Sequence, residues 1–155
     1  DFCLSRGLGD VYKRQIYEYY ENPQPEIEGN LNFGVTIINP GKVGIEYYMT
    51  RGHYHAKQHA AEIYVGLKGE GMVIMQTKGG QLAHMPIRRN DAIYIPAFWA
   101  HRTVNVSSTE LAFLYAYPSG AGHDYDVIKH KGFAKLVVER QGQPKVIANP
   151  RFIKG

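Results

Sequence analysis

Residues 52–64 read Gly-His-Tyr-His-Ala-Lys-Gln-His-Ala-Ala-Glu-Ile-Tyr, and this stretch has the composition of half a metal site. His53 and His55 are one residue apart, so both side chains point to the same side of an extended segment, because side chains alternate along a strand. Glu62 follows seven residues later, ahead of a strand-like run at 63–67, and a loop could carry its carboxylate to the same ion. An isolated His-x-His pair is weak evidence in a chain with seven histidines. The prediction therefore depends on a further ligand.

That ligand is His101, which follows an apolar strand-like run ending in Pro96. Together with His53, His55 and Glu62 it completes a set of three imidazoles and one carboxylate. Such a set suits a borderline divalent ion such as iron, manganese, nickel or zinc rather than calcium, and it leaves coordination positions open. Open positions predict catalysis or ligand capture at one divalent ion.

Short strand-like segments separated by turn sequences follow one another along the chain from residue 33 onward. The turn Asn39-Pro40-Gly41 predicts a hairpin between the first two segments. Many short strands with few helical patterns are typical of an antiparallel sandwich or barrel. We therefore expect an all-β chain that folds as a jelly-roll β-barrel with minor helical turns. The expected strands are 33–38, 43–50, 62–67, 72–77, 81–86, 92–96, 103–106, 111–117, 134–139 and 145–148, with a helical turn at 124–130 and either a strand or a helical turn at 16–20.

Length and composition limit the class of protein. A chain of 155 residues is most simply one domain. No stretch has the length and apolarity of a membrane span or of a signal-peptide core, which predicts a soluble cytoplasmic protein without a membrane partner. The single cysteine, Cys3, excludes an intramolecular disulfide. The net charge is +4, but the basic residues are scattered among acidic ones, so we expect no nucleic-acid partner.

Residues 1–15 differ from the rest of the chain, because they show neither strand alternation nor a helical stripe. They resemble translated adaptor read-through joined to a truncated gene. We predict that this segment is not native sequence, that it is mobile or packs without specific contacts, and that 16–155 form the single domain.

The residues of the predicted metal site also resemble the signature of a known family. The order His-x-His, glutamate, Gly69, proline, histidine and then Asn105 is similar to the two-part signature of the cupins. Two departures stand out: the glutamate comes later than usual, and Asn90 takes the place of a glycine, whose left-handed backbone conformation asparagine tolerates. More closely, 36–151 resemble the cupin-type phosphoglucose isomerases, which interconvert glucose 6-phosphate and fructose 6-phosphate. The matching blocks are 50–57, 61–64, 94–96, 99–105, 115–118 and 121–125.

The resemblance implies a cupin domain and a role for each matching residue. It implies a metal site of His53, His55, Glu62 and His101, for which we expect Fe²⁺ first and Mn²⁺, Ni²⁺ or Zn²⁺ as alternatives. Phosphate contacts fall on Thr36, Thr50, Gly52 and Tyr117. Tyr64, His123 and Tyr125 line the sugar; Glu62 is the candidate base, and His123 and Tyr125 are the next candidates. A homodimer is also implied, provided that the family's usual N-terminal segment, which this chain lacks, is not essential to it.

The predicted chemistry suits these residues. Moving a carbonyl between two sugar carbons requires both oxygens to be held together and a negative charge to be stabilised, which a divalent ion does as a Lewis acid. A buried carboxylate supplies a general base. The sequence leaves open whether hydrogen moves as a proton or as a hydride. It also leaves two other functions open, a metal-cupin oxygenase and a non-catalytic sugar-phosphate-binding cupin, but neither explains the phosphate-facing set Thr36, Thr50 and Tyr117 together with His123.

Overall fold

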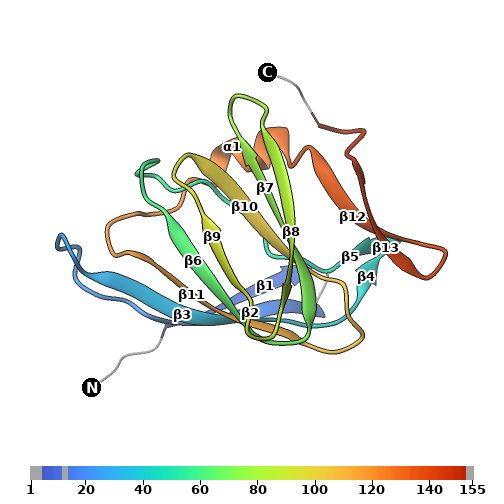
Figure 1. The fold of residues 1–155 in the computed structure, drawn as a ribbon, viewed down its shortest axis with the longest axis horizontal. Coiled ribbons are helices and arrows are strands. Elements are labelled where there is room, and N and C mark those ends of the chain that lie inside the picture. The colour runs from blue at the N-terminus through green and yellow to red at the C-terminus, as the bar shows by residue number, and fades with distance from the viewer. Residues whose placement is uncertain (1–4, 12–13, 153–155) are drawn as a thin grey trace.

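The computed structural model describes residues 5–11 and 14–152, and their regular secondary structure is almost entirely antiparallel β-strand (Figure 1). The largest sheet has six strands in the order β1-β2-β3-β11-β6-β9. Its strands are β1 (Ser5–Val11), β2 (Arg14–Asn22), β3 (Leu31–Ile38), β11 (Leu111–Pro118), β6 (Glu62–Lys68) and β9 (Ala92–Ile95).

Two smaller sheets and one helix complete the described fold. A three-stranded sheet contains β10 (Trp99–Asn105), β7 (Glu70–Thr77) and β8 (Leu82–Arg88) in that order. A four-stranded sheet contains β13 (Gln143–Ala148), β12 (Lys135–Arg140), β5 (Glu46–Tyr47) and β4 (Lys42–Val43) in that order. The helix is α1 (Asp126–Lys131). This architecture confirms the expected all-β barrel with a minor helical turn, and none of the described helices is long and apolar enough to cross a membrane.

The core lies on both sides of β7. Val73 and Met75 pack into the barrel interior with Phe113 from the six-stranded sheet. Ile74, which alternates with them, packs on the other side with Phe133 and its neighbours from the C-terminal region. β10 pairs along its whole length with β7, a strand that is packed on both faces. This pairing positions His101, one of the predicted metal ligands, on β10.

The expected hairpin across Asn39-Pro40-Gly41 is wrong. Both edges of β3 are already occupied, by β2 and β11, so no edge is left for the segment that follows. The chain instead passes to another sheet at Gly41, whose carbonyl accepts a hydrogen bond from the Tyr48 N–H at 2.9 Å. There β4 pairs with β5, and 48–50 continue alongside β10 through the hydrogen bond from Thr50 N–H to the Thr103 carbonyl.

The N-terminal region contains more strand than the sequence indicated. The uncertain segment 16–20 lies within β2, which pairs with β3. Within the segment expected to stand apart, 5–11 form β1 at the edge of the same sheet, paired with β2. Residues 1–4 and 12–13 lie outside the described part of the chain. The assignment of residues 1–15 as non-native sequence stays a prediction.

Candidate functional site

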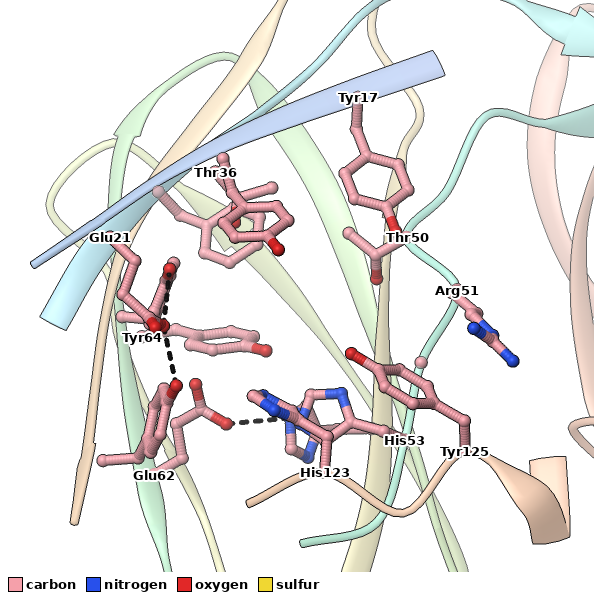
Figure 2. Close-up of a pocket in the computed structure, with 16 residues that line it drawn as sticks. Tyr17, Glu21, Thr36, Thr50, Arg51, His53, Glu62, Tyr64, His123 and Tyr125 are labelled. Carbon is pink, nitrogen blue, oxygen red and sulfur yellow. Dashed lines mark hydrogen bonds and ion pairs between the residues drawn. The ribbon is translucent and has the colours of Figure 1, made fainter. Parts of the chain in front are cut away.

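Ten of the eleven residues predicted for the site line one cavity of about 250 Å³ (Figure 2). They come from β3, β6, β10, β11, the segment 50–53 and the loop before α1. The eleventh, His55, is buried at 5% exposure beside the cavity. The predicted residues are therefore brought together, although they are spread over ninety positions of the sequence.

The two halves of the metal motif are neighbours in space. His53 and His101 form an isolated antiparallel bridge, in which the backbone of each residue donates to the other at 3.2 and 3.1 Å. Glu62 begins β6, whose next inward-facing side chain is Tyr64. The ligand atoms of His53, His55, Glu62 and His101 all lie within 4.8 Å of one another. One ion could contact all four side chains.

The hydrogen bonding of these histidines also suits a metal. Nε2 of His53, Nδ1 of His55 and both ring nitrogens of His101 are buried without a hydrogen-bond partner among the described residues. Nε2 of His101 lies 2.8 Å from Glu62 Oε2, but the directions of the two groups do not form a hydrogen bond. Buried polar atoms without a partner are costly. A cation bound between the four side chains would satisfy one ring nitrogen of each histidine.

The electrostatics keep Glu62 ionised. Burial by itself would raise the pKa of this carboxyl group, but the neighbouring imidazoles of His101 and His55 outweigh burial and lower its pKa to about 2. Glu62 Oε2 also lies 3.1 Å from His55 Nε2. A metal ligand and a general base both require the carboxylate form, which Glu62 therefore keeps at neutral pH.

Two of the nearby imidazoles, His53 and His123, have pKa values that favour the neutral form. Burial lowers the pKa of His53 well below its ordinary value, and nearby histidines lower it further. Burial also lowers the pKa of His123, against the opposing negative charge of Glu62. The ring of His123 lies 4.3 Å from that of His53 and stacks with Tyr125 at 5.7 Å. Neutral imidazoles can bind a metal or accept a proton, so both uses are open to this cluster.

Two of the residues predicted to bind phosphate, Thr50 and Gly52, lie in the segment around the first metal-site histidine, and Thr36 lines the same cavity from β3. Thr50 Oγ1 accepts a hydrogen bond from the Thr103 N–H at 3.1 Å, which leaves the hydroxyl proton of Thr50 free to point into the cavity. Gly52 has a positive φ of 76°, and a Cβ there would lie 2.6 Å from the Phe133 ring. Only glycine fits at this position without strain, so the backbone can approach a ligand closely.

Tyr117 lies in the cavity, but its hydroxyl, which was predicted to bind phosphate, is bonded to a carboxylate. Its hydroxyl donates to Glu21 Oε2 at 2.6 Å, and the Tyr115 hydroxyl donates to the same oxygen at 3.1 Å. A hydroxyl has only one proton to donate. The predicted phosphate contact of Tyr117 therefore competes with its bond to Glu21, and it stays a prediction.

The sequence did not point to several residues that line the cavity, among them Tyr17, Tyr19, Glu21 and Arg51. The first three alternate along β2, so their side chains share the inward face of that strand. The Arg51 guanidinium lies 4.3 Å from the centre of the Tyr125 ring. The alternation of 17, 19 and 21 was the available signal, but 16–20 could not be distinguished from a helical turn. His59, His84 and His130, which fitted no predicted site, are exposed.

Comparison with known proteins first defines the class. The structure of an oxalate oxidase matches this chain with a TM-score of 0.61 over 81% of this chain and 63% of its own length, at 19% identity. An identity this low supports the fold alone, which is the expected cupin jelly roll.

Sequence comparison then defines the family. A profile described as "Glucose-6-phosphate isomerase (GPI)" matches residues 6–151, and the chain belongs to this family. The relative from Thermococcus kodakarensis, named glucose-6-phosphate isomerase, is 49% identical over 137 residues, which cover 88% of this chain and 72% of the relative. A relative of the same name from Pyrococcus abyssi is 48% identical over 154 residues, which cover 97% and 82%.

Proposed function

We propose that this chain interconverts glucose 6-phosphate and fructose 6-phosphate at a single metal centre. The observation that carries the proposal is the convergence of three imidazoles and one carboxylate within 4.8 Å at the edge of a cavity that also holds hydroxyl groups and Gly52. Membership of the glucose-6-phosphate isomerase family supports the same reaction. The isomerisation consumes no oxidant or reductant, because the hydrogen that leaves one of the two carbons is taken up by the other, and a second hydrogen passes between their two oxygens.

The metal would be held by His53, His55, Glu62 and His101. This donor set suits Fe²⁺, which we place first, or Mn²⁺, Ni²⁺ or Zn²⁺. When bound, the ion would supply Lewis-acid stabilisation to the sugar oxygens.

The chain's own groups would position the sugar and move its proton. Glu62 is ionised and lies in the cavity, so it is the base we propose for the proton on the sugar carbon. His123 and Tyr125 line the same space, as Figure 2 shows, where they can hold sugar hydroxyls. Tyr64 is buried next to Glu62, and burial raises the pKa of its hydroxyl well above the ordinary value. Tyr64 is therefore a neutral hydrogen-bond donor to the sugar or to the carboxylate.

Phosphate would bind where Thr36, Thr50 and Gly52 meet the guanidinium of Arg51. Hydroxyls and a backbone N–H are suitable donors to phosphate oxygens, and a nearby cation strengthens such bonds. Arg51 lies at the exposed mouth, where its charge is available to an arriving anion. Arg51 adds a cation to a set that the sequence had predicted as uncharged.

One experiment tests site and reaction together. The purified protein is analysed for metal, stripped with a chelator and reloaded with Fe²⁺, Mn²⁺, Ni²⁺ or Zn²⁺ in separate samples, and fructose 6-phosphate turnover is followed in each. We expect chelation to abolish isomerisation and at least one ion to restore it. Activity that no ion restores would contradict the metal-dependent mechanism. Oxygen consumption, or tight sugar-phosphate binding without turnover in loaded protein, would instead indicate an oxygenase or a non-catalytic binding protein.

Thr50→Val should raise KM for fructose 6-phosphate, because a hydrogen bond to a charged group contributes about 1.5–3 kcal/mol. That corresponds to about 10- to 150-fold. Thr50→Ser keeps the hydroxyl and should restore most of the affinity, and metal content should be the same in both variants.

Tyr117→Phe should raise KM less than Thr50→Val does, because the Tyr117 hydroxyl is bonded to Glu21. An equal rise in KM would show that Tyr117 donates to phosphate. Equal turnover of unphosphorylated fructose by the parent would contradict the whole assignment.

We also propose a homodimer that pairs through the outer face of the six-stranded sheet. Phe33, Ala116, Ile63 and Tyr94 are register partners in a row across β3, β11, β6 and β9. The three large side chains in this row are exposed at 43%, 41% and 63%. An exposed row of uncharged side chains can pair with the same row of a second copy, and two-fold pairing of identical faces is the commonest assembly.

The dimer has a direct measurement. Light scattering should give a dimer mass for the parent, and Ile63→Glu should give a monomer, because it places a charge in the centre of the row. Arg89→Glu, which changes charge at an exposed turn, is the control and should stay dimeric. A parent that is monomeric at micromolar concentration would contradict the proposal. A cytoplasmic location and the absence of a nucleic-acid partner stay predictions from the sequence.

A further inference from the structure

Strand β2 lines one side of the cavity. Tyr17, Tyr19 and Glu21 all face inward from this strand. At the rise of an extended strand, Tyr17 and Glu21 are about 13 Å apart, which is enough to hold a six-carbon chain lengthwise. Tyr19 lies between them and is the register partner of Thr36. The two ends of the cavity can therefore contact different ends of one sugar phosphate.

The two ends differ in charge. At one end Tyr17 is close enough to Arg51 for the arginine backbone to hydrogen-bond its hydroxyl and for the guanidinium charge to act on it. The same guanidinium covers the ring of Tyr125. At the other end is the carboxylate of Glu21, on the side away from Arg51 and next to Tyr115 and Tyr117, as Figure 2 shows.

Glu21 presents an uncompensated negative charge. Both tyrosine hydroxyls donate to Oε2, which uses both lone pairs of that oxygen and leaves it without a proton. Among the side chains that the structure describes, those of 15–152, none forms a hydrogen bond with Oε1, and no lysine, arginine or histidine forms an ion pair with Glu21. The two bonds fix the carboxylate in place without neutralising it.

We propose that Glu21 is a specificity-determining residue that closes this end of the cavity to a second anionic group. The proposal rests on the proposed function, because it takes the phosphate to lie at the Arg51 end. A sugar hydroxyl can donate to the free Oε1, whereas a second phosphate would meet a fixed negative charge in a partly desolvated space. Like charges placed together in this way are strongly unfavourable. The chain thus favours a sugar monophosphate over a bisphosphate, with the phosphate oriented toward Arg51.

Two hexitols test this inference without depending on turnover. D-glucitol 6-phosphate and D-glucitol 1,6-bisphosphate lack a carbonyl and cannot be isomerised, so their dissociation constants can be measured by calorimetry on metal-loaded protein. We expect the parent to bind the monophosphate at least about tenfold more tightly, as expected for close like charges at intermediate screening. Glu21→Gln keeps the shape and an oxygen that can accept the tyrosine hydroxyls. It should shift the ratio of the two constants toward the bisphosphate by about tenfold or more.

Matched variants separate charge from structure. Glu21→Asp keeps the charge and should keep the exclusion. Glu18→Gln removes the same charge from the opposite face of β2, outside the cavity lining, and should leave the ratio as in the parent. A ratio unchanged by Glu21→Gln, or a parent that binds both hexitols equally, would overturn the role of Glu21. Fructose 6-phosphate turnover by the parent is measured separately and tests the proposed function alone. Turnover supports that function even if Glu21→Gln leaves the binding ratio unchanged, and the absence of turnover contradicts it whatever the binding ratio is.

Discussion

Glu62→Gln is expected to lower the turnover of fructose 6-phosphate by about 10²–10⁴-fold, the usual contribution of a positioned base. Glutamine keeps the shape of the side chain and an oxygen that can still contact an ion, but it loses the charge and nearly all of the basicity. In the parent, the imidazoles of His101 and His55 keep this carboxyl ionised with a pKa of about 2. Metal affinity should therefore fall moderately, while the chemical step should fall far more.

The measurement must separate these two effects. Turnover is compared at saturating metal and saturating substrate, with metal occupancy determined in both proteins. Glu18→Gln is the matched control, because it also removes one negative charge from this part of the chain but lies outside the cavity lining, on the opposite face of β2. Near-parental turnover by fully loaded Glu62→Gln would leave Glu62 as a ligand only. The base would then have to be sought at His123 or Tyr125.

The strands could largely be predicted from the sequence because turn residues separate them. Short β-branched and aromatic runs with glycine, proline or asparagine between them correspond to β6 to β13, usually within two residues at either end, although β10 begins four residues earlier than expected. What local sequence could not reveal is which strand edges are free. Asn39-Pro40-Gly41 is a good turn signal, but β3 was already paired on both sides, so the turn led to another sheet. Pairing is a tertiary property that a turn sequence does not encode.

The metal cluster could be predicted because its residues keep a fixed spacing within two short motifs. Backbone hydrogen bonds between His53 and His101 bring the two motifs together. The acidic end of the cavity could not be predicted in this way. Glu21 follows a tyrosine-rich segment whose period was ambiguous, and its partners Tyr115 and Tyr117 lie more than ninety residues away. The role of Glu21 depends on which side chains face it, and these are set by the register in which β2 pairs with β3.

Gly52 links the fold to the site, because it lies between Arg51 and His53 and has no room for a side chain. A Cβ would lie 2.6 Å from Phe133 Cε2 and 2.9 Å from the His101 carbonyl oxygen. Neither neighbour can move easily: Phe133 is 1% exposed and has the Arg102 guanidinium 4.5 Å from its ring centre, while the His101 backbone is paired with His53.

Gly52→Ala is therefore expected to lower the free energy of unfolding by about 2–5 kcal/mol, combining about 1–2 for the left-handed backbone with about 1–3 for overpacking. Gly142→Ala is the matched control, because Gly142 has a similar φ of 72° but no atom within 4 Å of the added Cβ. Its cost should be the backbone part alone. Denaturant unfolding of both variants measures the difference, which is the cost of the overlap. If Gly52→Ala and Gly142→Ala lower the free energy of unfolding equally, the space beside Gly52 can expand. The close approach of this backbone to Phe133 would then not be what holds Arg51 and His53 in position.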